Sequence, residues 1–145
     1  MQFTGDGVMA VFGAPFPQED HADRALHVAT DIHVRQAELN ERWRAETRAP
    51  FALGIGLSTG EVAAALLGSD QRLEYTLVGD TVNLSARLQD LARPGGSIVM
   101  SEATFVALSE APEAERMDPT AVKGRESLVQ AYKVTVVEDA TAIGP

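Results

Sequence analysis

The chain has 145 residues, 45% of them hydrophobic, which suits one domain with a real core and is too short for two comfortable ones. Its formal net charge of -9 argues against a nucleic-acid or anionic-membrane surface, because like charges repel. The lack of cysteine excludes disulfides and thiolate metal sites. The sequence shows no signal-peptide pattern and no apolar run of about 20 residues, so we expect a cytoplasmic domain without a membrane segment.

The first motif is a Gly-Asp-Gly turn at residues 5–7, which lies between two apolar runs. Glycine on both sides of Asp6 frees the backbone, and residues 8–12, beginning with Val8, predict a buried strand that leaves the turn. This geometry can present Asp6 at a sheet edge as a candidate for metal or phosphate binding. An ordinary hairpin is the alternative, since most Asp-Gly turns bind nothing.

A long amphipathic helix is predicted from Ala22 to about Ala45, with Asp20 as its N-cap after two prolines. Apolar residues recur at helical spacing and predict one face packed on a sheet: Leu26, Ala29, Ile32, Leu39 and Trp43. Three histidines are six residues apart, on different helix faces, which favours capping or a solvated surface over a shared metal site: His21, His27 and His33.

Residues 51–58 and 61–68 predict two strands joined by a turn, and residues 73–78 predict a further short strand after a polar connection. The spacing of Gly54, Gly56 and Gly60 does not match the dinucleotide-binding fingerprint. Close backbone packing is the better interpretation of these glycines.

The second informative segment is residues 79–91, which predicts a turn and then a helix capped by Asp80. Asn83 and Arg87 are four residues apart and therefore share one helix face. Such a pair can direct a neutral hydrogen-bonding group and a fixed cation at one ligand, as stabilising an oxyanion or a polyphosphate requires. A solvated helix face is the alternative.

The last third predicts a strand at 97–100, a short helix capped by Ser101, an acidic irregular stretch at 111–120 and a strand at 128–137. Lys123 and Arg125 form a compact basic spot, which suits either phosphate binding or a solvated hairpin tip. Residues 138–145 are expected to be a disordered tail or linker.

Three motifs in this order resemble the catalytic domain of class III nucleotidyl cyclases, the adenylate and guanylate cyclases. They are FTGDGVMAVFGAP at residues 3–15, YTLVGDTVNLSARL at 75–88 and VKG at 122–124. The resemblance implies an α+β, ferredoxin-like cyclase fold with a mixed, mainly antiparallel sheet, and it places the domain at residues 1–137. The sequence EDHA at residues 19–22 resembles that of the bacterial branch of the family, whose cyclase domains are often fused to signalling or ATPase modules.

The resemblance also implies the chemistry: a head-to-tail homodimer that converts ATP or GTP to the 3',5'-cyclic nucleotide and pyrophosphate at the subunit interface. Asp6 matches one of two aspartates that hold two Mg2+ or Mn2+ ions. Asn83 matches the asparagine that orients the ribose, and Arg87 matches the arginine that stabilises charge at the reacting phosphate, both in the partner chain's site. Lys123 matches the lysine that binds the triphosphate.

Gln2 and Thr76 match the two positions at which the family selects the purine base of its substrate. Common adenylate cyclases have Lys and Asp there, and common guanylate cyclases have Glu and Cys. Threonine at the second position occurs in an adenylate-cyclase subgroup, whereas glutamine at the first is a departure. A glutamine amide can donate or accept a hydrogen bond and so can serve either base. We expect ATP, with GTP as the alternative.

The family's first metal-binding aspartate lies on an opening strand that, with two helices, precedes the Gly-Asp turn, and no segment of this chain matches it. One carboxylate is too few for two hard cations, so we expect the chain by itself to be inactive. It is then either a truncated cyclase domain or a non-catalytic regulatory or dimerisation module. The missing strand should be central in the sheet, so we expect a swapped or rearranged oligomer, or neighbouring strands that close the gap.

Overall fold

The computed structural model describes the whole chain except residues 1, 5–6, 70–71, 94, 122–126 and 137–145. The described helices are α1 (His21–Ala45), α2 (Asp80–Leu91) and α3 (Glu102–Ala107). The described strands are β1 (Gln2–Thr4), β2 (Gly7–Met9), β3 (Gly54–Leu57), β4 (Ala63–Ser69), β5 (Arg72–Val78), β6 (Ser97–Ser101), β7 (Glu115–Arg116) and β8 (Ala131–Thr135). The predicted tail at 138–145 lies outside the described residues.

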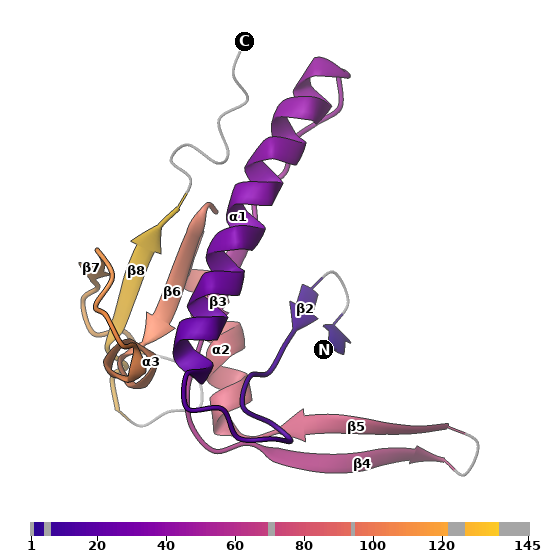
Figure 1. Ribbon diagram of the computed structural model, residues 1–145, viewed down its shortest axis with the longest axis vertical. Helices are drawn as coiled ribbons and strands as arrows, with labels where there is room; N and C mark the ends of the chain where they lie inside the picture. The colour runs from indigo at the N-terminus through magenta and orange to yellow at the C-terminus, as the bar shows by residue number, and fades with distance from the viewer. Residues whose placement is uncertain (1, 5–6, 70–71, 94, 122–126, 137–145) are drawn as a thin grey trace.

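The body of the molecule is a four-stranded sheet in the order β3-β6-β8-β7. β3 and β6 are parallel, whereas β6 with β8 and β7 with β8 are antiparallel. The long helix α1 crosses one face of this sheet and α2 lies behind the other (Figure 1). This mixed, mainly antiparallel arrangement confirms the expected α+β fold class.

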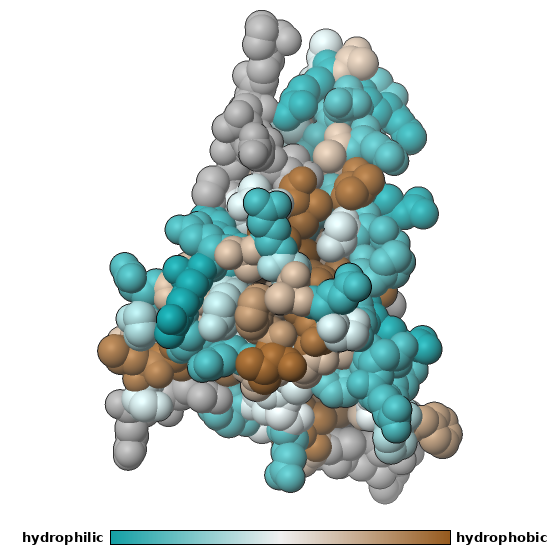
Figure 2. All heavy atoms as spheres, turned by 60° about the vertical axis from the view of Figure 1, so that its left-hand side comes forward, coloured by the Kyte–Doolittle hydropathy of each residue, from teal (hydrophilic) through white to brown (hydrophobic). Residues whose placement is uncertain are grey.

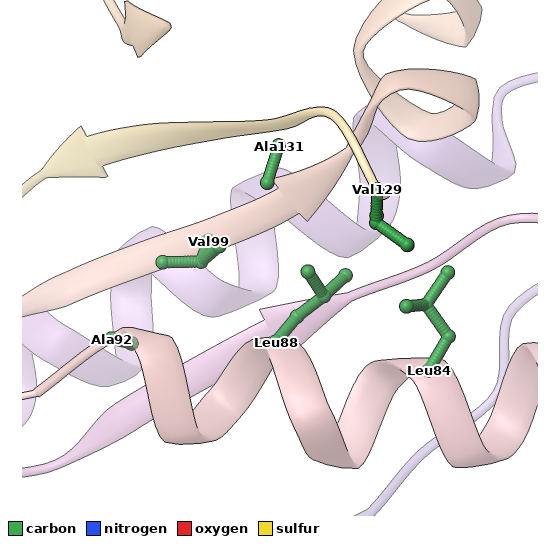
Figure 3. Packing of buried hydrophobic residues seen from close by; sticks show 6 residues of the cluster. All are labelled: Leu84, Leu88, Ala92, Val99, Val129 and Ala131. Atoms are coloured by element: carbon green, nitrogen blue, oxygen red, sulfur yellow. The ribbon is translucent and has the colours of Figure 1, made fainter. Parts of the chain in front are cut away.

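Both faces of β6 are buried, which makes it the centre of the core. Ile98 and Met100 pack towards α1 and α3, and Val99 packs towards α2; all three side chains are fully buried. The alternation follows from the two-residue period of a strand. Figure 3 shows the α2 side, where Leu84 and Leu88 point at the strands; the cluster is completed by Ala92, Val99, Val129 and Ala131.

Helix α1 confirms the predicted span, but two of its side chains were placed wrongly. Ile32 is 42% exposed instead of packed on the sheet. His33 is only 2% exposed, and its Nε2 donates to the carbonyl oxygen of Ser97 at 3.0 Å, so the surface interpretation was wrong. Burial lowers the pKa of His33, with the hydrogen bond to Ser97 opposing it. The carbonyl that accepts this hydrogen bond is 64 residues away in sequence, so the spacing of residues within the helix could not predict it.

The N-terminus of α1 differs from the prediction in one detail. Asp20 is the N-cap residue, but its side chain makes no capping hydrogen bond. Its Oδ1 instead accepts from Arg24 Nε at 2.8 Å, and this hydrogen bond lowers the pKa of Asp20. The ion pair with Arg24, four residues later, thus takes the Asp20 carboxylate that would otherwise accept a capping hydrogen bond from the backbone.

The predicted strands at 51–58 and 61–68 exist as β3 and β4, but they do not pair with each other. β3 pairs with β6, and β4 pairs with β5 in an antiparallel hairpin from Ala63↔Val78 to Ser69↔Arg72. The hairpin extends away from the body of the molecule (Figure 1). The acidic stretch predicted to be irregular contains β7, which pairs with β8.

The opening strands form a small separate pair. β1 and β2 are antiparallel, with Gln2 opposite Met9, and no hydrogen-bonded ladder joins them to the four-stranded sheet among the described residues. β2 ends at Met9 and Val8 is 59% exposed, so the prediction of a buried strand over residues 8–12 was wrong. Among the described strands, β3 forms one end of its sheet, and the pair β1–β2 does not join it.

Large apolar side chains remain at the surface of the described part. Figure 2 shows a broken band of hydrophobic residues down the middle of one face, between hydrophilic margins. The exposed large hydrophobic residues are Val8, Phe16, Val28, Ile32, Val34, Phe51, Val78, Val106 and Leu128. No helix of the described part is long and apolar enough to cross a membrane.

Candidate active site

Of the six predicted site residues, the structure brings two together. Asn83 and Arg87 lie on α2, and both are exposed. Gln2 lies in β1 and Thr76 in β5, where the backbone alone is described.

The two remaining positions, Asp6 and Lys123, lie outside the described residues. Their assignment to metal and triphosphate therefore stays a prediction from the sequence.

Helix α2 begins one residue earlier than the sequence suggested. Gly79, with φ 140°, is the N-cap, and Asp80 is the first helical residue, so the assignment of Asp80 as the cap was wrong. A φ in this region favours glycine because it has no Cβ. The backbone N–H of Asn83 donates to the carbonyl of Gly79 at 3.2 Å, which places Asn83 in the first turn.

Two sides of α2 pack against the body of the molecule, and a third side is exposed. Leu84 and Leu88 enter the core, and the neighbouring side lies directly on β3. A Cβ on Gly56 would overlap backbone atoms of Ser85 and Gln89, which confirms that close backbone packing explains this glycine. Asn83 and Arg87 occupy the remaining, exposed side.

The exposed pair has the chemistry that an anionic ligand needs. The Arg87 guanidinium offers several N–H donors in a rigid plane, and the Asn83 amide offers both a donor and an acceptor. Both side chains are exposed, so neither is used in the packing of α2 on the core or on β3.

The described residues do not form a metal site of their own. No group of three or more His, Asp or Glu side chains gathers in the described ranges where it could hold an ion. A two-metal site therefore does not fit the described residues by themselves, and Asp6 is outside them.

A hollow of about 720 Å3 lies between residues 11–18 and the first turns of α1. Of the two predicted site residues whose side chains are described, neither Asn83 nor Arg87 lines it.

Sequence patterns did not reveal the contacts that hold the first turn of α2. Ser58 Oγ donates to the carbonyl of Thr81, and Thr81 Oγ1 donates to the carbonyl of Glu61 at 3.0 Å. Two sequence features are related to these contacts: a small residue stands at every second position from 54 to 60, and the first turn of the predicted helix contains the hydroxyl of Thr81. That pattern does not identify its partner before the fold is known.

The sequence profile of the adenylate and guanylate cyclase catalytic domain matches residues 1–135, nearly the whole chain. The chain belongs to the class III nucleotidyl cyclase family. Adenylate cyclase 1 of Rhizobium meliloti is 33% identical over 138 residues, which are 94% of this chain and 21% of that protein. This chain thus spans about a fifth of the length of that relative.

Solved cyclase structures share the fold of this family member. The guanylyl cyclase Cya2 aligns with a TM-score of 0.85 and 32% identity, over 95% of this chain and 70% of that chain. The adenylyl cyclase CyaB from P. aeruginosa aligns with a TM-score of 0.84 and 30% identity, over 91% of this chain and 68% of that chain. Similarity to cyclases of both base specificities leaves the substrate base open.

Proposed function

We propose that this cyclase domain, in its full-length context, converts ATP to 3',5'-cyclic AMP and pyrophosphate. The observation that carries the proposal is the exposed pair Asn83 and Arg87, four residues apart on the side of α2 that neither the core nor β3 occupies. Nucleotide cyclisation needs an oriented ribose and a stabilised phosphate, and these two side chains supply one group for each task.

The reaction forms one bond and breaks one bond at the α-phosphorus. The ribose 3'-oxygen attacks it, the bond to the pyrophosphate oxygen breaks, and the 3'-hydroxyl proton is released. Asn83 holds the ribose so that its 3'-oxygen lies in line with the leaving group. Arg87 donates hydrogen bonds to the phosphate oxygens as charge develops, which lowers the barrier.

A protein with a formal charge of -9 needs local positive charge to hold a triphosphate. Arg87 supplies part of it, and Lys123 is proposed to supply another part. Cyclases of this family use divalent metal ions, and Asp6 is proposed as one ligand. Because Asp6 alone is too few ligands for two ions, we expect the 145-residue chain by itself to have little or no activity.

Cyclase domains act as dimers, and two features support a dimer here. Asn83 and Arg87 face outward from their own chain, where a second subunit can present a nucleotide. The β4–β5 hairpin extends away from the body, and an isolated two-stranded hairpin is marginally stable in water. We propose that a partner chain covers this hairpin.

The direct test replaces Arg87 by alanine in the full-length protein and measures cyclic nucleotide formation from ATP and from GTP with Mn2+. Loss of one charge-stabilising group should lower kcat about 100-fold. The matched control is Arg35→Ala on α1, an exposed arginine that should leave kcat unchanged. Unchanged turnover in Arg87→Ala would rule out its assigned role.

A non-catalytic regulatory or dimerisation module is the alternative function. It is favoured if the full-length wild-type protein forms no cyclic product from either nucleotide. Faster product formation from GTP than from ATP would instead identify a guanylate cyclase.

A further inference from the structure

The segment from β3 to residue 60 presents a small residue to α2 at every second position. A Cβ added to Gly54 would lie 3.2 Å from the Gln89 carbonyl oxygen and 3.3 Å from Ala92 Cβ. Gly56 lies against the backbone of Ser85 and Gln89. The helix axis therefore approaches this strand as closely as two backbones allow, which leaves α2 no room to move towards the sheet.

At the N-terminal end of α2 the contact changes from packing to hydrogen bonding. Ser58 Oγ donates to the carbonyl of Thr81, and Thr81 Oγ1 donates to the carbonyl of Glu61 at 3.0 Å. Between them, a Cβ on Gly60 would meet Thr81 Oγ1. Residues 58–61 thus surround Thr81 and are bonded to it in both directions, through one accepted and one donated hydrogen bond.

These bonds act on the turn that carries the proposed catalytic asparagine. Asn83 is two residues after Thr81, and its N–H donates to Gly79 in the same turn. Arg87 follows about 6 Å further along the axis than Asn83, on nearly the same side of the helix. Since a helix side chain extends roughly 6 Å from the axis, a rotation of α2 by about 10° displaces both groups by about 1 Å.

We propose that Ser58 and Thr81 are positioning residues that set the rotation of α2 and thereby aim Asn83 and Arg87 at the partner chain's nucleotide. The inference rests on the proposed function and adds to it two residues that do not touch the substrate. Packing against the glycines of β3 sets the closest distance between α2 and the strand. It resists sliding and rotation of α2 only weakly, because glycine has no side chain that could interlock with the helix. Leu84 and Leu88 in the core hold the middle of α2, and the two directional hydrogen bonds add resistance at its first turn.

The test compares Thr81→Val, which keeps the shape and removes the hydroxyl, with Thr81→Ser, which keeps the hydroxyl. Ser58→Ala removes the other hydrogen bond with a smaller change in volume. The control is Thr30→Val on α1, where Thr30 Oγ1 also donates to a backbone carbonyl, that of Leu26, at 2.9 Å. Steady-state kcat and KM for ATP are measured in the full-length protein, together with deuterium uptake of residues 79–85 and the melting temperature.

Positioning predicts that kcat falls about tenfold or more in Thr81→Val and in Ser58→Ala, because a displacement of about 1 Å can cost up to roughly 100-fold in rate. KM should stay within about threefold, since the triphosphate keeps its other contacts. Thr81→Ser should recover most of kcat, and Thr30→Val should behave as wild type. Deuterium uptake of residues 79–85 should rise in Thr81→Val and not in Thr30→Val.

Three results would overturn the inference: unchanged kcat in both Thr81→Val and Ser58→Ala, equal loss in Thr81→Ser and Thr81→Val, or unchanged uptake of residues 79–85. If Thr81→Val fails to fold, Ser58→Ala decides by the same measurements. If wild type forms no cyclic product, the proposed function fails by itself. The uptake of residues 79–85 then decides separately whether the two hydroxyls hold the first turn of α2.

Discussion

Gly56→Ala should be the most informative single substitution in this domain, because it adds one methyl group at the tightest helix–strand contact. The new Cβ would overlap backbone atoms of Ser85 and Gln89 and would lie 3.0 Å from the carbonyl carbon of Leu88. None of these atoms can rotate away, so α2 must move from β3 by several tenths of an ångström or more. Overpacking of this kind costs about 1–3 kcal/mol, and the reduced backbone freedom of alanine in the unfolded chain offsets up to about 1 kcal/mol.

Gly54→Ala provides the graded control on the same strand. Its Cβ would meet Gln89 and Ala92 at 3.2 and 3.3 Å, where a shift of a few tenths of an ångström suffices. The packing cost and the gain in the unfolded state should nearly cancel, so the free energy of unfolding should change by less than about 1 kcal/mol. The two glycines therefore separate a backbone clash from the general effect of replacing glycine by alanine.

The assay is urea unfolding followed by the fluorescence of Trp43, the single tryptophan, whose ring lies 5.3 Å from that of Phe51. Cyclase activity of the full-length protein is measured in parallel, because a displaced α2 carries Asn83 and Arg87 with it. Gly56→Ala should lower the urea midpoint and kcat, and Gly54→Ala should change neither strongly. Equal midpoints for the two variants would refute the backbone contact on which the reasoning depends.

Three further stability predictions follow from single buried contacts. Burial lowers the pKa of His33, so the unfolded chain binds the proton more readily than the folded chain. The melting temperature should therefore fall as the pH drops through about 6.5. His33→Gln should flatten this pH dependence, whereas the exposed control His27→Gln should not. Leu88→Ala should cost about 2–5 kcal/mol in urea unfolding, because a fully buried side chain leaves a cavity; a loss below about 1 kcal/mol would contradict the packing in Figure 3. Asn40→Ala should lower the free energy of unfolding by about 1–3 kcal/mol. The substitution removes two hydrogen bonds, because Asn40 Nδ2 donates to the Phe51 carbonyl at 2.8 Å and its Oδ1 accepts from the Phe51 N–H at 3.1 Å. A free energy of unfolding equal to that of wild type would show these bonds to be dispensable.

The elements that the sequence predicted well are those with a local signal. The 3.6-residue period placed α1 and α2 almost to the residue, and Ser101 caps α3 as expected, with its side chain accepting from the Thr104 N–H. The family resemblance, carried by three short motifs, is confirmed by the profile match. The exposure of Asn83 and Arg87 on one side of α2 agrees with their spacing.

The errors concern contacts between distant segments. The pattern of residues 51–68 showed two strands but not that β3 would pair with β6 and β4 with β5, because strand periodicity carries no information about the partner. Val8 resembled a core residue and is exposed, since β2 pairs with β1 alone among the described strands. Asp80 resembled a cap, yet Gly79 takes that place because the chain must enter α2 with a positive φ.

The sequence by itself determined the family, the order of the elements and the pair Asn83 and Arg87, because motifs and periodicities depend on residues close together in the chain. The tertiary structure decided what holds that pair in place. The backbone contact of Gly56 with α2 and the bond from Ser58 to Thr81 join segments more than 20 residues apart. Such contacts exist only once β3, paired with β6, provides the surface on which α2 packs.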